Sequence, residues 1–291
     1  MHIITSNLKI PEDDKPIRII TKVLMGNTEY TALWDTGATN TVVNKNIIDN
    51  NCDLFEYVGE TTITNYNSVT SKASAYTVNI GFICDNNKKK NIKVKVIDRV
   101  AEIFLNQGID VIIGLDIILK QELFLNNGVF QLVFSNDCEV ITNDLNYIIC
   151  NGIGINGNYG RALLDTANFF TMAHSTLIAD DLNLNYRCSG DCPNAEYHRL
   201  KNNCSECNNC IDEQNIYTGN NIFLTIQNSE TRFQMRNLHE NTNNNPFKKG
   251  NYELILGMDF ILNSDLEIKN GAVMFCYQNT QVDTTINQLL G

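Results

Sequence analysis

The sequence predicts an all-β protein made of two similar lobes. Short segments rich in β-branched and aromatic residues recur along the chain, mostly bounded by Gly, Asn, Asp or Pro, and this pattern is typical of strands. Two motifs occur twice, in the same order, which indicates an internal duplication. The chain has 291 residues, a length that accommodates two domains of ordinary size.

The repeated motifs divide the chain. Residues 32–36 (ALWDT) recur 130 residues later as 162–166 (ALLDT), and residues 111–119 (VIIGLDIIL) recur 143 residues later as 254–262 (LILGMDFIL). The second copy is therefore longer between its motifs, where the sequence is rich in cysteine. We expect an N-terminal segment at 1–16, a first lobe at 17–134, a linker at 135–146, and a second lobe at 147–291 with a cysteine-rich insertion at 188–210.

The elements expected within the lobes are nearly all strands. Asn127-Gly128 and Asn270-Gly271 are turn pairs that accept positive φ, and an apolar run follows each of them, as in a hairpin. Only 116–122 and 259–265 look helical, each with its first aspartate as the N-cap. Short helices thus follow each apolar-apolar-Gly motif. The predicted strands are 17–23, 30–34, 76–84, 92–97 and 128–134 in the first lobe, and 147–155, 221–227 and 272–277 in the second.

Charge and hydropathy exclude several classes of protein. A net charge of −11 argues against binding to nucleic-acid phosphates. No apolar run reaches the length of about 18 residues that a membrane-spanning helix needs. The first residues lack a basic segment followed by an apolar one, so no secretory signal is predicted. We expect a cytoplasmic or intracellular protein that binds neither nucleic acid nor membrane, and a viral origin is compatible with this.

An Asp-Thr-Gly sequence at the end of an apolar strand, residues 35–37, is by itself typical of a turn. The apolar-apolar-Gly motif that follows in each copy changes the interpretation. Its glycines, Gly114 and Gly257, would let the backbone approach the aspartate loop closely. Because the combination occurs twice in tandem, coincidence is a poor explanation.

Asp35-Thr36-Gly37-Ala38 together with Ile112-Ile113-Gly114-Leu115-Asp116 resembles a retropepsin, the aspartic protease unit of retroviruses and gypsy-type retrotransposons. The resemblance covers roughly 17–134 and 145–278, and it is more specific in the first copy. Retroviral proteases pair two identical chains, whereas pepsin-like enzymes join two diverged lobes in one chain. The resemblance implies two β-barrel lobes related by a pseudo-two-fold axis, within a monomer.

The activity implied by the resemblance is that of an aspartic endopeptidase. Asp35 and Asp165 would lie about 3 Å apart and share one proton. The ionised carboxyl would activate a water, and the protonated one would donate to the scissile carbonyl oxygen of an extended protein or peptide substrate. Thr36 and Thr166 would support the loops by hydrogen bonds across the axis. No cofactor is implied for catalysis.

The second copy departs from the family pattern, since it has Ala167 and Asn168 where the first has Gly37 and Ala38. A positive φ at Ala167 would cost on the order of 1 kcal/mol and displace the carboxylate, whereas a negative φ would make the alanine harmless. A non-catalytic peptide-binding protein with a degenerate second site is therefore the alternative function. We also hypothesise that the Asn168 side chain donates to Asp165 and draws the negative charge towards it.

The substrate cleft is predicted from the same comparison. A hairpin at 61–75 would form a flap, with Tyr66 near its tip either covering substrate or simply exposed. Ile112, Ile113, Gly114 and Gly257 would line the cleft. In the second copy the corresponding interval holds the cysteines, so the cleft would be asymmetric.

The cysteine-rich insertion offers metal ligands. Close C-x2-C pairs favour a structural zinc in a reducing compartment, while disulfides in an exported protein or free thiols remain alternatives. Such a zinc would brace a loop and take no part in hydrolysis. The candidate ligands are Cys188, Cys192, Cys204, Cys207 and Cys210.

Overall fold

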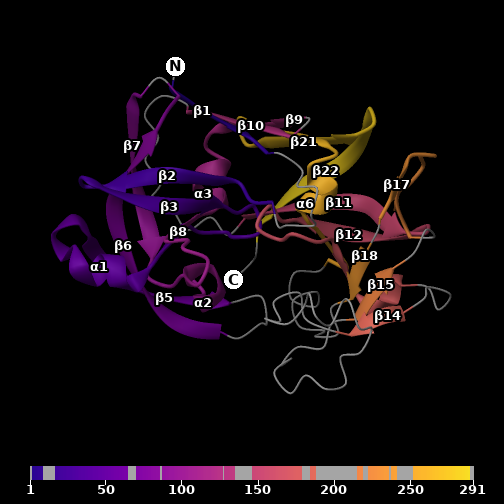
Figure 1. Ribbon diagram of the computed structural model, residues 1–291, viewed down its shortest axis with the longest axis horizontal. Coiled ribbons are helices and arrows are strands. Elements are labelled where there is room, and N and C mark those ends of the chain that lie inside the picture. The colour runs from indigo at the N-terminus through magenta and orange to yellow at the C-terminus, as the bar shows by residue number, and fades with distance from the viewer. Residues whose placement is uncertain are drawn as a thin grey trace.

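Strands predominate in the computed structural model, as the sequence predicts, and they pair into two sheets (Figure 1). No helix among the described residues is long and apolar enough to cross a membrane. The structure describes residues 2–8, 17–64, 70–85, 87–126, 128–134, 146–178, 184–187, 215–218, 222–235, 237–240 and 252–288.

The first copy forms a closed barrel. Its strand order is β2-β3-β8-β4-β7-β6-β5, and β2 also pairs with β6, which closes the ring. Val23 of β2 lies opposite Phe82 of β6, and both side chains are fully buried. The strands are β2 (Ile20–Met25), β3 (Thr28–Trp34), β4 (Val42–Val43), β5 (Glu56–Thr64), β6 (Thr70–Ile83), β7 (Lys89–Ile97) and β8 (Val111–Ile113).

The second copy repeats this order with different strand lengths. Its order, β11-β12-β19-β13-β18-β15-β14, corresponds strand by strand to that of the barrel, and β16 pairs with β11 and β17. The strands are β11 (Asn146–Ile155), β12 (Asn158–Leu164), β13 (Met172–Ala173), β14 (Leu184–Arg187), β15 (Asn215–Thr218), β16 (Phe223–Ile226), β17 (Arg232–Gln234), β18 (Asn237–Glu240) and β19 (Leu254–Leu256).

A second closed barrel, which the sequence predicts, is not formed by the described residues of the second copy. These residues make an open, curled sheet. The long strand β6 pairs with β5, β7 and β2. In the second copy two short strands make the equivalent pairings: β15 pairs with β14 and β18, and β16 pairs with β11. The sequence between them, residues 219–221, is Gly-Asn-Asn, and these residue types are depleted in strands.

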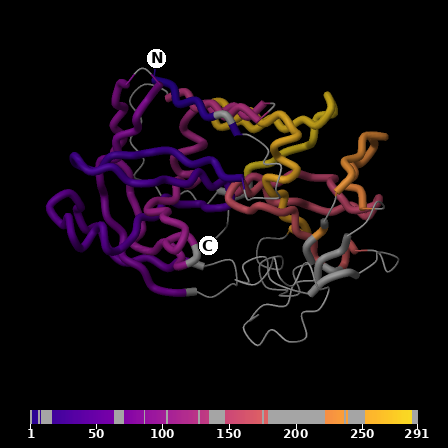
Figure 2. The backbone as a smooth tube through the Cα atoms, in the orientation of Figure 1, coloured from indigo at the N-terminus to yellow at the C-terminus, as the bar shows by residue number. Residues whose placement is uncertain are grey.

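A shared sheet joins the two copies. Strand β9 (Glu122–Asn126) of the first copy pairs with β20 (Asp265–Lys269) of the second. β1 (His2–Asn7), from the segment expected only to precede the first lobe, pairs with β10 (Val129–Phe134). The sheet continues through β21 (Ala272–Tyr277) and β22 (Thr280–Gln288) to β11. Figure 2 shows the early part of the chain on one side and the late part on the other, with these strands between them.

Short helices follow both apolar-apolar-Gly motifs, as predicted, but the predicted N-caps are wrong. Asp116 and Asp259 each lie inside their helix, and the N-caps are Gly114 and Gly257. Each aspartate side chain accepts hydrogen bonds from a threonine that follows the aspartate loop, and from the amide of the next helix residue. The helices are α1 (Lys45–Asn50), α2 (Glu102–Leu105), α3 (Leu115–Ile118) and α6 (Met258–Ile261), and short 3-10 turns occur at Cys52–Leu54 and Ser175–Leu177.

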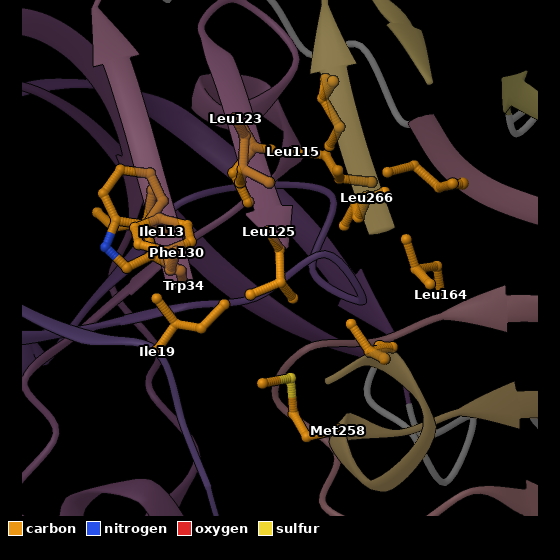
Figure 3. Packing of buried hydrophobic residues seen from close by; sticks show 14 of the residues in the cluster. Ile19, Trp34, Ile113, Leu115, Leu123, Leu125, Phe130, Leu164, Met258 and Leu266 are labelled. Atoms are coloured by element: carbon orange, nitrogen blue, oxygen red, sulfur yellow. The ribbon is translucent and has the colours of Figure 1, made fainter. Parts of the chain in front are cut away.

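One apolar core runs through both copies (Figure 3). Trp34 and Phe130 are fully buried in the first copy, with ring centroids 5.8 Å apart. Leu125 of β9 lies opposite Leu266 of β20, and both are buried. The sheet that joins the copies therefore also joins their cores.

Candidate active site

The two aspartates lie at the ends of equivalent strands. β3 pairs with β8 in parallel, and β12 pairs with β19 in the same register. The Asp35 amide donates to the Ile113 carbonyl at 2.9 Å, and the Asp165 amide donates to the Leu256 carbonyl at 3.1 Å. The apolar-apolar-Gly strand thus holds the first residue of each aspartate loop, as the sequence predicts.

The two loops are interlocked by Thr36 and Thr166. The Thr36 hydroxyl donates to the Leu164 carbonyl at 2.8 Å and accepts from the Thr166 amide at 3.0 Å. The Thr166 hydroxyl donates to the Trp34 carbonyl at 2.9 Å and accepts from the Thr36 amide at 3.0 Å. Both threonines are buried, so these four bonds are shielded from water and place the loops back to back.

The interlock places the two carboxyl groups next to each other: the Asp165 carboxyl lies against Gly37 of the other loop, and each carboxyl acts on the pKa of the other. Each carboxyl also accepts two backbone amide bonds through its Oδ1 atom. Gly37 and Ala38 donate to Asp35 at 2.7 and 3.1 Å, and Ala167 and Asn168 donate to Asp165 at 2.9 and 3.0 Å. The donor at Asn168 is therefore its backbone amide, the same group that Ala38 uses. The hypothesised donation from the Asn168 side chain is not observed.

The two carboxyls differ in their surroundings. Burial and the neighbouring charge of Asp165 raise the pKa of Asp35 well above its usual range, despite the opposing amides of Gly37 and Ala38. Burial raises the pKa of Asp165 as well, but its backbone donors, the hydrogen bond from Asp35 and the charge of Arg18 oppose the rise. The pair titrates as a unit, and the Arg18 charge acts on Asp165.

The departure at Ala167 does not strain the loop. Neither Gly37 nor Ala167 has a positive φ, so alanine in place of glycine causes no backbone strain at this position. The Ala167 methyl is buried in an apolar cluster with Leu33 and Ile112. A Cβ atom on Gly37, by contrast, would come within 2.6 Å of the Asp165 carboxyl carbon. The same loop position therefore accepts a side chain in one copy only.

Gly114 and Gly257 are required by close backbone approach. A Cβ atom on Gly114 would meet the Asn40 carbonyl carbon at 2.6 Å, and one on Gly257 would meet that of Phe170 at 2.5 Å. Both glycines have φ near −90°, so the constraint is space and not conformation. The sequence predicts this close approach in both copies.

Comparisons with known proteins add little to this geometry. No protein-family model and no curated protein matches the chain. A similar solved structure is that of basic 7S globulin from soybean, with 9% sequence identity, a TM-score of 0.47, and coverage of 99% of this chain and 96% of that chain. A likeness at this level supports no inference about activity.

Two of the residues predicted to line the cleft, Ile112 and Ile113, lie on opposite faces of their strand. Ile112 lies in the cluster with Leu33 and Ala167, next to the aspartate loops. Ile113 has no exposed surface and belongs to the main core, because neighbouring residues of a strand face opposite sides.

The predicted flap is a hairpin. β5 and β6 pair up to Thr64 and Thr70, and the tip with Tyr66 lies outside the described residues. β14 and β15 pair in the same way in the second copy, and the sequence between them contains the cysteine-rich insertion. Those cysteines also lie outside the described residues, so the structural zinc stays a prediction.

One pair of contacts near the loops was not anticipated. The Thr41 amide and hydroxyl each donate at 2.8 Å to Asp116, and Thr171 donates in the same way to Asp259. The same hydroxyls accept from the amides of Gly114 and Gly257 at 3.2 Å. The signal was present in the sequence, because both threonines follow their aspartate loops at the same spacing.

Proposed function

We propose that this chain is a single-chain aspartic endopeptidase, with its two halves arranged as in a retropepsin dimer. The observation that carries the proposal is the close placement of two carboxyls, Asp35 and Asp165, whose loops are held together by reciprocal threonine bonds. Two carboxyls this close hold a single proton between them. Such a pair can act as base and acid in the same step.

The proposed reaction begins with the proton on Asp35. The Asp165 carboxylate takes a proton from water, and the water oxygen attacks the scissile carbonyl carbon. Asp35 gives its proton to the carbonyl oxygen, which produces a neutral tetrahedral diol. Asp165 then protonates the leaving nitrogen as the C–N bond breaks, and a diol hydroxyl returns a proton to Asp35. The dyad ends the cycle in its starting state.

The alternative, a non-catalytic peptide-binding protein, rested on the departure at Ala167. That residue has no positive φ and retains its amide bond to Asp165 at 2.9 Å. The reason for expecting a degenerate second site is therefore removed, and catalysis is the better-supported function.

The test is cleavage of a mixed peptide library by the purified chain. We expect cleavage that a pepstatin-type transition-state mimic inhibits and that Asp35→Asn and Asp165→Asn each abolish. Asp265→Asn, an exposed aspartate on β20, serves as the matched control and should cleave normally. Absence of cleavage by the folded protein, or cleavage that persists in both dyad variants, would refute the proposal.

A further inference from the structure

The strands that lead into the dyad are in equivalent register in the two copies. Ile20 of β2 pairs with Leu33, and Ile149 of β11 pairs with Leu163. Leu33 and Leu163 are each two residues before their aspartate. Residues at the same distance before Ile20 and Ile149 therefore occupy corresponding places beside the dyad.

Those places hold different residues, Arg18 in the first copy and Tyr147 in the second. Each interacts with the aspartate of the other copy. The Arg18 charge acts on Asp165, while Tyr147 interacts with Asp35. A guanidinium is always charged, whereas burial and the Asp35 charge raise the pKa of Tyr147 and keep its hydroxyl neutral. The dyad thus has a cation on one flank only.

Two aromatic rings hold the guanidinium in place. The Arg18 Cζ atom lies 4.2 Å from the ring centroid of Phe169 and 5.1 Å from that of Phe104. Both distances are within the range of cation–π attraction. Phe169 directly follows Asn168, whose amide donates to Asp165 at 3.0 Å. The ring that holds the cation therefore belongs to the loop that carries its target carboxyl.

We propose that Arg18 is a positioning residue, which keeps the negative charge of the dyad on Asp165 and the shared proton on Asp35. It acts through the carboxyls and needs no contact with substrate. The assignment of Asp165 as base and Asp35 as acid rests on the proposed function, whereas the placement of the proton does not. From the described part of the flanking strands, Arg18 interacts with Asp165 and Tyr147 interacts with Asp35.

The test is carbon-13 NMR titration of the aspartate carboxyls, assigned with Asp35→Asn and Asp165→Asn. In the unsubstituted protein Asp165 should ionise first. Arg18→Gln should raise the lower pKa of the pair by about one unit, and Phe169→Leu should raise it in the same direction. Arg18→Lys keeps the charge and should retain most of the effect. The control is Arg232→Gln, since Arg232 stacks on Phe223 on the separate strands β16 and β17.

Two results would overturn the inference. The first is ionisation of Asp35 before Asp165 in the unsubstituted protein. The second is a lower pKa of the pair that Arg18→Gln and Phe169→Leu leave unchanged, or that the control Arg232→Gln shifts by as much as Arg18→Gln does. Because the titration needs no turnover, a shifted pKa in a protein that cleaves nothing refutes only the proposed function. If the protein cleaves peptides, Arg18→Gln should shift the acid limb of the pH profile of kcat/KM to higher pH.

Discussion

At the scale of residues, Gly37 and Ala167 occupy equivalent positions but have opposite tolerance for a side chain. A Cβ atom on Gly37 would meet the Asp165 carboxyl, whereas the Ala167 methyl already fills an apolar cluster. The difference arises because the dyad is not symmetric. Its flanking residues and its packing distinguish the two aspartates.

Gly37→Ala should therefore lower kcat/KM for peptide cleavage by about 100-fold, because a displacement of reacting groups by about 1 Å has that effect. Ala167→Gly should keep most of the activity and lower the free energy of unfolding by about 1 kcal/mol, through loss of a buried methyl. Steady-state kinetics and urea unfolding of both variants measure the contrast. Full activity in Gly37→Ala would contradict the geometry.

The sequence identifies Asp35 and Asp165 because their motif is repeated, but it does not identify Arg18 and Tyr147 as equivalents. A constant offset of 130 residues aligns Arg18 with Ile148. The strand register shifts by one residue at a bulge between Asn151 and Ile153, and this shift brings Tyr147 into the corresponding place. A bulge has no reliable signature in a single sequence.

At the scale of elements, the strands were predictable and the first helix was not. The segment Lys45–Asn50 contains Asn and Ile, which have modest helix propensity. The helix is stabilised by its context, because the Asn44 side chain accepts from the Asn46 amide at 3.0 Å and Ile47 and Ile48 are buried. The predicted aspartate N-caps fail for a related reason, since Thr41 and Thr171 supply better partners for those carboxylates.

Each apolar-apolar-Gly strand crosses so close under its aspartate loop that one added methyl group on its glycine should destabilise the fold. Gly114→Ala would press against the Asn40 backbone, and overpacking of this kind costs on the order of 3 kcal/mol. The comparison is Gly157→Ala, where φ is +90° but no atom lies within 4 Å, so only about 1 kcal/mol of backbone strain is expected. Urea midpoints give both values, and equal losses would show that the close contact is unimportant.

At the scale of the whole molecule, buried carboxyls should make the fold more stable in mild acid. Burial raises the pKa of Asp116 and of Asp259 to about 6, against the opposing bonds from Thr41 and Thr171. The folded state thus binds more protons than the unfolded chain between pH 4 and 6. The contribution of these two carboxyls to stability is then greatest below about pH 4 and falls as the pH rises through 6, by on the order of 2–3 kcal/mol for each carboxyl.

Thermal unfolding between pH 4 and 7 measures this slope. Asp116→Asn should flatten it, although the variant is less stable at every pH because its amide faces the donors of Thr41. Asp265→Asn removes an exposed carboxyl and should leave the slope as it is. Stability that rises between pH 4 and 6 would contradict the direction of the shifts.

The pairing of β9 with β20 also affects how the protein is made. The ribosome completes β9 well over a hundred residues before it reaches β20, so the nascent first half has one strand edge with no neighbour. An open edge of this kind recruits other strands. We therefore expect the speed of translation over that interval, and the binding of chaperones to the nascent chain, to determine whether β9 pairs with β20 of its own chain or with a strand of another chain.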